Sequence, residues 1–527
     1  MTNSPSGATA PVVDERSRNL SWDPQVGHPH RQRILAVACL ALVMVVVAVS
    51  SLNVAIPTIV TDLKPSSTEL LWIVDAYALV FAGLLLLAGA IGDRYGRKKA
   101  LVAGLIVFGT ASFFASFAET PTLLIAARAV MGLGAAFVMP STLSIITSVF
   151  PPMERPKAIA TWAGFAGAGG ALGPLLSGLV LKWGDWEEVF LINVPLVLIT
   201  LAAVLVIVPV SRDTHARRLD PVGALLSVVT LGALLLGIIE GPDKGWGSAF
   251  VLIAFAVAVL AAVGFIAWEL RTKVPMLDPR YFKIPGFSAG SGVIVALFFG
   301  MFGMFFLVAQ YLQFVKGYTA LTSGVATLPS AAMMIIIAPR SAGLAEKFGS
   351  RRVVVSGALF AAAGFGVMSR FTPDTPYIWV ALALVLIGSG MAQAMAPSST
   401  SIVTSLPLDK AGVASAVNDT TREVGGALGI AILGTILTSQ FSSSMSAALP
   451  ATVPDQVREV ATEGIGPALG VAQQAPAEFS AQLVDAAHHA FTDGFHVAFL
   501  VSTALMLLVA VGAGIFMPRQ LDMSAGH

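Results

Sequence analysis

Long apolar runs, separated by short polar or basic segments, fill the chain from Ile34 to Phe516. A helix needs about 20 apolar residues to cross the roughly 30 Å hydrocarbon core of a bilayer. The pattern therefore predicts fourteen spanning helices, at 34–57, 70–91, 100–118, 122–143, 158–180, 189–209, 221–240, 249–268, 288–314, 322–341, 353–370, 377–398, 413–438 and 495–516. We expect an all-α polytopic membrane protein with both termini on one side.

Composition supports this class and excludes others. The 527 residues are 56% hydrophobic and 12% charged, with a mean hydropathy of +0.82, which no soluble domain of this size shows. The net charge of +1 does not indicate binding to nucleic acid. Cys39 is the only cysteine and the histidines avoid the apolar centres, so we expect no metal site and no cofactor.

The basic residues predict the orientation. Most of the 31 Lys and Arg fall on the side of the N-terminus. The opposite side holds only Lys64, Lys182, Lys244, Lys316, Arg370 and Arg458. Because cytoplasmic loops are enriched in Lys and Arg, we expect a multi-pass protein of the cytoplasmic membrane with both termini in the cytoplasm.

An internal repeat predicts the domain organisation. The segment 89–99 reads G-A-I-G-D-R-Y-G-R-K-K, and 342–352 repeats its order of acid, base, aromatic, glycine and paired bases as A-G-L-A-E-K-F-G-S-R-R. The copies follow the second and tenth spans, so two extra helices separate two six-helix halves. The predicted parts are a disordered cytoplasmic tail (1–33), a six-helix bundle (34–210), a linker with two extra spans (211–285), a second six-helix bundle (286–516) and a cytoplasmic tail (517–527).

The second bundle contains a long extracytoplasmic loop at 439–494, rich in Ala, Pro, Ser and Gln. Two of its segments, Pro454–Glu463 and Ala477–Phe491, can form short amphipathic helices. We expect a surface cap and assign it no chemistry.

Two charged residues lie inside the apolar spans of the first half. Asp75 sits roughly 8 Å below the outer end of its predicted helix, where a charge costs on the order of 3 kcal/mol. It is the leading candidate for a proton carrier; the alternative is a carboxyl that neighbouring helices hold by hydrogen bonds. Arg128 is its candidate charge partner, unless its helix starts later and Arg128 merely snorkels to the interface.

The basic turn after the second span is a candidate gate. Gly89 and Gly96 allow a tight turn. Asp93 can accept hydrogen bonds at a helix end, Arg94 can reach acids on the neighbouring bundle, and Arg97 belongs to the same charged turn.

The fifth span carries the small-residue sequence G-G-A-L-G-P-L-L-S-G at 169–178. Gly169 and Gly173 lie on one face, where another helix can approach closely. Pro174 cannot donate a backbone hydrogen bond and loosens the helix there. We assign these three residues to gating; ordinary close packing is the alternative.

A second charged cluster lies in the thirteenth span. Asp419 and Glu423 are four residues apart and share a helix face, and Arg422 is one turn from Asp419. The cluster is either a self-neutralising ion pair or a cavity acid that binds protons or cations.

The ninth span is rich in Phe and Met, which suit flat apolar cations. The candidate cargo contacts are Asn53, Tyr77, Phe302, Gln310, Tyr311 and Asn418.

Several motifs together resemble the major facilitator superfamily. They are G-D-R-Y-G-R-K-K after the second span, R-A-V-M-G-L-G in the fourth, and the fifth-span pattern, which is similar to the signature of antiporters. Two extra central helices, W-I-V-D-A-Y at 72–77 and I-N-V-P at 192–195 resemble the fourteen-helix drug:proton antiporters. The resemblance implies two bundles that rock about a central cavity, with proton entry driving cargo exit.

Two positions depart from that family pattern. Ala48 stands where relatives often carry an Asp in the first span, and W-E-E-V-F at 186–190 carries Glu187 in place of a cation. The first departure removes any role for a carboxylate in that span.

We therefore expect a proton-coupled antiporter, not an enzyme, that exports amphipathic, cationic drugs or toxic compounds. Its partners are a small amphiphilic substrate, protons and membrane lipids; we expect a monomer that binds no nucleic acid. A lipid, siderophore or secondary metabolite is the alternative cargo, and a membrane receptor or scaffold the alternative class. A nucleotide-driven pump is disfavoured because the sequence has no G-x-x-x-x-G-K-[ST] motif.

Overall fold

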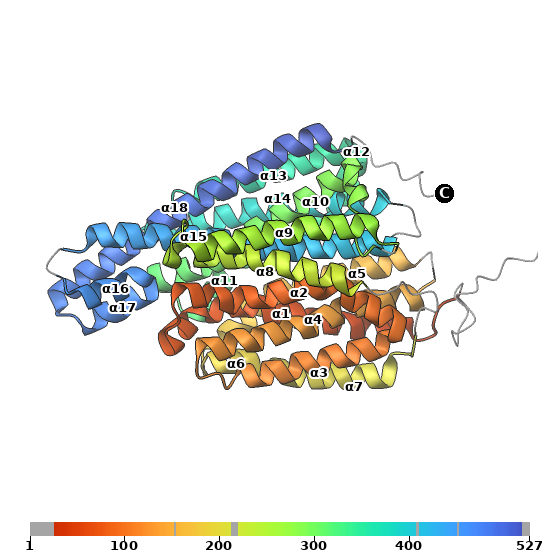
Figure 1. The fold of residues 1–527 in the computed structure, drawn as a ribbon, viewed down its shortest axis with the longest axis horizontal. Helices are drawn as coiled ribbons and strands as arrows, with labels where there is room; N and C mark the ends of the chain where they lie inside the picture. The colour runs from red at the N-terminus through yellow and green to blue at the C-terminus, as the bar shows by residue number, and fades with distance from the viewer. Residues whose placement is uncertain are drawn as a thin grey trace, which may run out of the picture.

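The computed structural model describes residues 26–151, 154–211, 220–273, 275–406, 411–450 and 453–518, and these ranges contain helices and no strand. Most of the helices run along one long axis (Figure 1). In chain order the elements are α1 (Arg31–Leu63), α2 (Ser67–Tyr95), α3 (Arg97–Ala115), α4 (Pro121–Val149), α5 (Arg155–Val180), α6 (Trp186–Leu191), α7 (Asn193–Ile207), α8 (Pro221–Lys244), α9 (Ala249–Arg271), η2 (Pro279–Lys283), α10 (Pro285–Gln310), η3 (Tyr311–Val315), α11 (Ala320–Ala326), α12 (Leu328–Phe348), α13 (Ser350–Met368), α14 (Tyr377–Thr404), α15 (Ala411–Ala448), α16 (Asp455–Glu463), α17 (Ile465–Gln474) and α18 (Ala477–Phe516).

The helical prediction is confirmed. Within the described residues, 13 segments are long and apolar enough to cross a membrane. The remaining predicted span, 158–180, is α5, a 26-residue helix outside those 13, several of whose side chains are not described. Two predicted spans are interrupted, because α6 is followed directly by α7 and α11 by α12.

The last predicted span and the preceding loop differ from the structure. α18 begins at Ala477 rather than 495, so the predicted helix Ala477–Phe491 is not separate but forms the first turns of α18. Hydropathy misses these turns because polar residues share them with buried Leu483 and Ala487. The other predicted loop helix is confirmed as α16. The expected disordered tail was 1–33, but α1 already begins at Arg31; residues 1–25 of that tail, and the residues beyond 518, lie outside the described residues.

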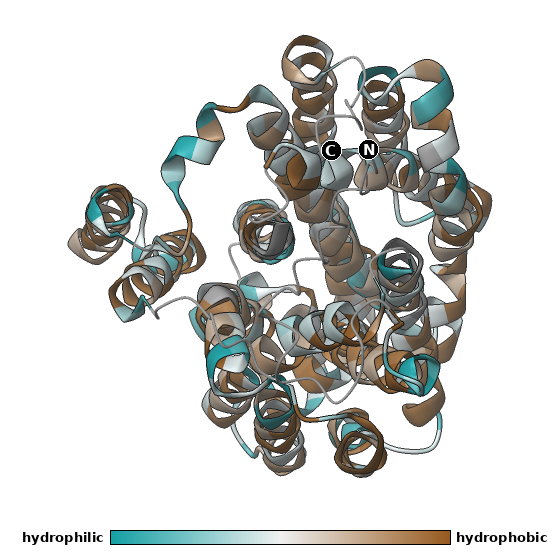
Figure 2. Cartoon of the chain, turned by 90° about the vertical axis from the view of Figure 1, so that its right-hand side faces the viewer, coloured by the Kyte–Doolittle hydropathy of each residue, from teal (hydrophilic) through white to brown (hydrophobic). Residues whose placement is uncertain are grey.

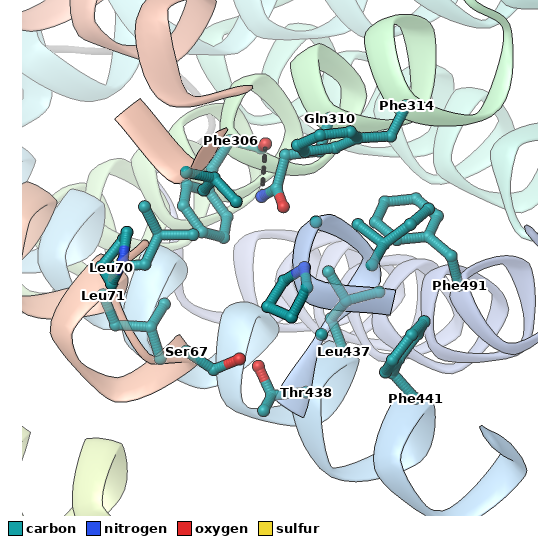
Figure 3. A pocket seen from close by; sticks show the side chains of 16 residues that line it. Ser67, Leu70, Leu71, Phe306, Gln310, Phe314, Leu437, Thr438, Phe441 and Phe491 are labelled. Atoms are coloured by element: carbon teal, nitrogen blue, oxygen red, sulfur yellow. Dashed lines mark hydrogen bonds between the residues drawn. The ribbon is translucent and has the colours of Figure 1, made fainter. Parts of the chain in front are cut away.

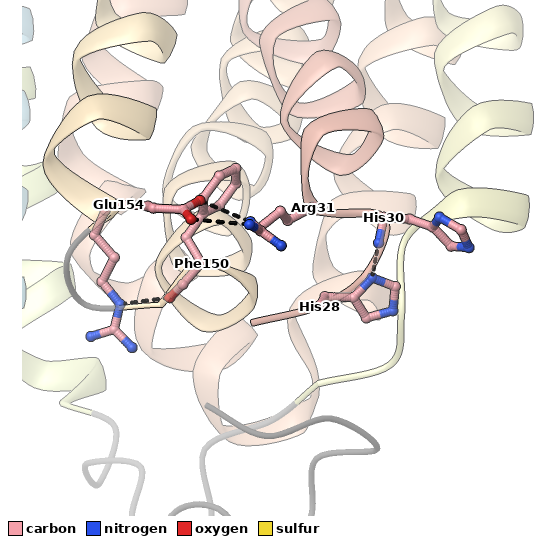
Figure 4. A network of polar contacts seen from close by, with 6 residues as sticks. His28, His30, Arg31, Phe150 and Glu154 are labelled. Carbon is pink, nitrogen blue, oxygen red and sulfur yellow. Dashed lines mark hydrogen bonds and ion pairs between the residues drawn. The ribbon is translucent and has the colours of Figure 1, made fainter. Parts of the chain in front are cut away.

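The two ends of the molecule are distinct. α16 and α17 project beyond one end, at the left of Figure 1, which we call the loop end. α1 begins and α18 ends at the other, the termini end, which faces the viewer in Figure 2. There Arg31 Nε and Nη2 donate to the two carboxylate oxygens of Glu154 at 2.8 and 3.0 Å (Figure 4). This ion pair ties the start of α1 to the start of α5.

Local signals in the sequence set where the spans begin and turn. Ser66 and Glu69 form a capping box at the start of α2. Gly96 and Gly349 have φ of +123° and +86°, which only glycine adopts readily, and each joins one helix directly to the next. These glycines occupy equivalent positions in the two copies of the repeat, so the repeated sequence produces a repeated turn.

The helices group by their contacts. Helices α1 to α7 pack mainly on one another, and so do α10 to α18, while α2 packs on α15 and α5 on α11 and α12 across the seam between these groups. α8 contacts α2, α15 and its partner α9. α9 exposes large apolar side chains such as Leu252 and Leu260, as expected of a helix that faces lipid.

The seam is closed at the loop end. A Cβ on Gly434 of α15 would lie 2.3 Å from Leu71 of α2. A Cβ on Gly178 of α5 would lie 2.6 Å from Leu321 of α11, and Gln313 Nε2 donates to the Val54 carbonyl at 3.0 Å. Each contact joins the two groups near the loop end, so the structure is a state in which this end is sealed.

Candidate functional site

A fully buried acid and a fully buried base lie together between α2 and α4. Asp75 and Arg128 both have 0% of their surface exposed. Arg128 Nε donates to the Ile73 carbonyl at 3.0 Å, and its guanidinium lies 4.6 Å from the centre of the Tyr77 ring. Arg128 attracts Asp75 electrostatically. α4 begins at Pro121, two turns before Arg128, so the snorkelling alternative does not hold.

Neither carboxylate oxygen of Asp75 has a hydrogen-bond partner among the described residues. The alternative that neighbouring helices hold this carboxyl by hydrogen bonds is therefore not supported. A buried polar group without partners costs about 1–3 kcal/mol, and such a cost usually has a functional reason. The group is thus available to hold a proton.

A glycine permits this arrangement. A Cβ added to Gly132 of α4 would lie 2.4 Å from the Tyr77 carbonyl oxygen, closer than real Cβ atoms come to any neighbour. Close backbone contact at small residues is the usual way in which membrane helices pack. Gly132 therefore brings the helix of Arg128 against the helix of Asp75.

The second charged cluster lies on α15, across the seam. Arg422 Nη1 is 3.7 Å from Asp419 Oδ1, and the side chains of Arg422 and Asp419 are 21% and 14% exposed. The Arg422 guanidinium lies 5.5 Å from the centre of the Phe298 ring. Glu423 is half-buried and within electrostatic reach of both Asp419 and Tyr77. Tyr77 thus lies between the two clusters.

The candidate gate turn has a different partner from the one expected. Asp93 Oδ1 accepts from Arg97 Nε at 2.7 Å, and the Arg97 backbone N–H donates to the Ser211 carbonyl at 3.0 Å. Arg94 is exposed and lies over the ring of Tyr95 at 5.7 Å, and it makes no ion pair with a described residue. The Asp93–Arg97 pair closes the turn within the first half.

Gly89 and the fifth-span glycines make close contacts within the first half. A Cβ on Gly89 would lie 3.3 Å from Pro140 of α4. A Cβ on Gly169 or Gly173 would meet α1 at Val46 or Ser50, inside the first half. The contact across the seam comes instead from the Pro174 carbonyl, 2.6 Å from a Cβ on Gly324 of α11.

The candidate cargo contacts are not gathered into one site. Asn53 and Asn418 are buried, each with an Oδ1 that has no partner among the described residues, and Phe302 packs on Gly426. Gln310 lines a cavity near the loop end. Tyr311 is buried between Phe371 and Phe495 and donates to the Thr372 carbonyl, which places it in the core of the second half.

Sequence reasoning missed the residues that close the seam. Gly178, Gly324 and Gly434 make close contacts across it, yet glycines are common in membrane helices and local spacing does not reveal a partner 140 or more residues away. The position of Gly178, one turn after Pro174 on the same helix, is the only signal in the sequence that points to them.

A polytopic helical bundle with two repeated halves and charged groups inside its spans is typical of membrane transporters. The family model of the Major Facilitator Superfamily matches residues 38–430. The chain belongs to this superfamily.

Among curated proteins, the chain is 36% identical to a protein named multidrug efflux pump LfrA from Mycolicibacterium smegmatis, over 92% of this chain and 96% of that protein. It is 33% identical to the tetracenomycin C resistance and export protein of Streptomyces glaucescens (91% and 90%), and 35% identical to the methyl viologen resistance protein SmvA of Salmonella typhimurium (91% and 97%).

Solved structures agree in fold. A bacterial homolog of the human lysosomal transporter Spinster, in an inward-facing and unoccupied conformation, matches with a TM-score of 0.64 at 18% identity, covering 92% of this chain and 98% of that one. A D-xylose–proton symporter matches with a TM-score of 0.61 at 13% identity, covering 93% and 98%.

Proposed function

We propose that this protein exports amphipathic, cationic compounds across the cytoplasmic membrane in exchange for protons. The observation that carries the proposal is Asp75, a fully buried carboxyl without hydrogen-bond partners, beside Arg128. The names of relatives that cover nearly the whole chain, which refer to multidrug efflux and to resistance, support drugs as the cargo.

The proposed orientation puts the termini end in the cytoplasm. The excess of Lys and Arg at that end supports it, since cytoplasmic loops are enriched in these residues. In this orientation the sealed loop end faces outward.

We propose that the halves 34–210 and 286–516 act as two bundles, with α8 and α9 from the segment 211–285 beside the seam. When the outer contacts part, Asp75 can take a proton from the outside. When they close again, the carboxyl must give up that proton inward before the next cycle. Arg128, the buried cation beside this carboxyl, can serve as the counter-ion of the carboxylate that remains after release.

The remaining candidates have subordinate roles in this proposal. The turn at Asp93 and Arg97 controls the switch between states, while Glu423 and Asp419, partly open beside the seam, attract the cation. The chain acts as a monomer surrounded by lipid, because the two halves of one chain supply both sides of the seam.

Transport into inverted membrane vesicles tests the proposal. The acidified lumen of such vesicles should lose protons when tetraphenylphosphonium is added outside, as read by a pH-quenched dye, and vesicles without the protein should not respond. A protonophore should abolish cargo uptake and vanadate should not. Uptake that persists in the presence of the protonophore would contradict proton coupling.

The name of one relative supports a second class of cargo. A relative at 33% identity is named for tetracenomycin C resistance and export, so a secondary metabolite is the alternative substrate. A panel of neutral polycyclic compounds in the same vesicle assay separates the two, because only the cation exporter should prefer tetraphenylphosphonium over neutral compounds of similar size.

A further inference from the structure

The helices α16 and α17 form a hairpin at the loop end, and this loop-end hairpin packs against the seam. α17 packs on α1 and α18, and a Cβ on Gly466 would lie 2.1 Å from Val60 of α1. The Ser67 hydroxyl at the start of α2 donates to the Glu463 carbonyl at the end of α16. The segment from α16 to α17 therefore covers the outer end of the first half while belonging in sequence to the second.

A cavity lies beneath this hairpin. It is small, with a cavity volume of about 40 Å³, and it is partly open to solvent. Figure 3 shows side chains from both halves around it, with aromatic and aliphatic groups in the majority. Its apolar wall includes Leu70, Leu71, Phe306, Phe314, Phe441 and Phe491.

Few polar groups reach the cavity, and they come from three different elements. Gln310 lines it from the last turn of α10, Thr438 from α15 and Ser67 from α2. Gln310 is followed by a π-helical turn, Tyr311–Val315, a rare feature that is frequent at functional sites. Apolar walls with a small number of polar groups are typical of small-molecule sites.

The rim of the cavity is acidic. Gly464, which lines it, follows Glu463 directly. Burial and the nearby carboxylates of Glu459, Asp243 and Glu69 raise the pKa of Glu463 above its ordinary value. Lys244, the neighbouring cation, is paired with Glu240 at 3.0 Å. The carboxylates thus leave an excess of negative charge beside the cavity, which attracts cations.

We propose that this cavity is an exit-side binding site that holds the apolar part of an organic monocation, with the positive group at the acidic rim. The inference rests on the proposed export function. The aromatic and aliphatic walls favour the apolar part of the cargo because they remove its surface from water, and the carboxylates supply the charge that distinguishes a cation from a neutral compound.

The position of the site gives it a defined step in transport. Its walls come from both halves, so it exists only while the loop end is closed and is divided when that end opens. Leu71 lies one helical turn from Asp75, about 6 Å along the axis of α2. Cargo would occupy the site immediately before release to the outside.

Photolabelling of the full-length protein in nanodiscs tests the location. The probe is an azide-bearing tetraphenylphosphonium, and mass spectrometry identifies the labelled peptides. We expect label on the α15 and α18 segments that contain Phe441 and Phe491, with unlabelled tetraphenylphosphonium protecting about tenfold better than neutral triphenylphosphine oxide, a ratio worth ~1.4 kcal/mol. Label confined to other segments, or equal protection by the neutral compound, would overturn the proposal.

Two pairs of variants test the residues. Thr438→Phe fills the cavity, whereas Thr438→Val keeps the volume of the side chain. Glu463→Gln removes a rim charge, and Glu119→Gln removes an exposed charge at the same end, away from the cavity. Thr438→Phe should lower labelling and tetraphenylphosphonium efflux about fivefold or more, and Glu463→Gln should weaken binding about threefold, as expected for a solvent-facing charge.

Thr438→Val and Glu119→Gln should behave as the unaltered protein does. If Thr438→Phe does not reach the membrane, Phe441→Leu replaces it, since it removes a ring without crowding the cavity, and should also lower labelling. Variants that label and transport normally would refute the site. Failure of the unaltered protein to transport would instead refute the export function, while cavity labelling would still establish a cation site.

Discussion

The charged clusters of the two halves differ in how far they are buried and in how their charges are paired. In the first half, Asp75 and Arg128 are completely enclosed, and the carboxyl has no hydrogen-bond partner among the described residues. In the second, Asp419 and Arg422 approach each other to 3.7 Å and remain partly exposed, beside a half-buried Glu423. The first cluster is fully enclosed, whereas the second is partly exposed and contains an ion pair, although Arg422 Nε also has no hydrogen-bond partner among the described residues.

This difference suggests a division of labour. A sealed carboxyl cannot exchange a proton with water until the helices around it move, so its protonation is tied to the conformational change. An open cluster can exchange protons and meet cargo without such a change. We therefore propose that proton coupling belongs to the first half and cation attraction to the second.

Of the variants that test this comparison, Asp75→Asn should have the largest effect. Asn preserves the shape of the side chain but cannot titrate, so proton-driven efflux should fall more than about tenfold, a change of ~1.4 kcal/mol or more. Protein level in the membrane and the equilibrium affinity for tetraphenylphosphonium should stay within a few-fold. The measurements are vesicle dye quenching and cargo binding to the purified protein.

Near-normal cargo-induced proton flux in Asp75→Asn vesicles would show that Asp75 is not the proton carrier. The proton carrier would then lie in the open cluster, with Glu423 as the next candidate. Loss of both binding and protein level would mean instead that Asp75 acts in packing.

Glu423→Gln tests the other side of the comparison. We expect affinity for tetraphenylphosphonium to fall about fivefold, because one partly screened charge is worth up to about 1 kcal/mol. The number of protons moved per cargo molecule should not change. A neutral compound of similar size serves as the control, since its binding should be unaffected. An altered proton-to-cargo ratio would contradict the division of labour.

The sequence identified both clusters because a charge within an apolar run stands out without any knowledge of contacts. It placed Asp75 and Arg128 near each other, but it did not reveal that one cluster is sealed and the other open. That distinction depends on how α2, α4 and α15 pack, and single contacts such as Gly132 on Tyr77 decide it.

The dependence on tertiary packing also explains why the prediction and the structure differ at the two ends of the molecule. The basic turn was evident, yet which arginine pairs with Asp93 depends on the bend at Gly96, which brings Arg97 within 2.7 Å. The sequence predicts the first turns of α18 as a separate loop helix because their apolar residues are spaced among polar ones and are buried only by tertiary contacts.

The two repeated turns extend the comparison to the termini end. Asp93 pairs with Arg97, whereas Glu346 in the second copy is exposed and makes no ion pair with a described residue. Asp93→Asn should slow the transport rate about twofold to fivefold while leaving cargo affinity within a few-fold, because a partly exposed pair contributes up to about 1 kcal/mol. Glu346→Gln is the matched control and should change neither. Stopped-flow dye efflux and equilibrium binding provide the two readouts, and a large loss of affinity in Asp93→Asn would argue against a gating role.

The smallest expected effect concerns the charge that the first half lacks. Ala48 on α1 is buried, at a position where a carboxylate would add a second negative charge to the sealed half. A dication in a low-dielectric site needs two compensating charges, because an unpaired one retains much of its desolvation cost. We therefore expect the protein to export a monovalent quaternary ammonium compound a few-fold faster than its bivalent analogue. Ala48→Asp should narrow this ratio, whereas Ala48→Asn, of similar size and without charge, should not. Equal export of the two compounds by the unaltered protein would show that the open cluster around Glu423 already supplies the second charge.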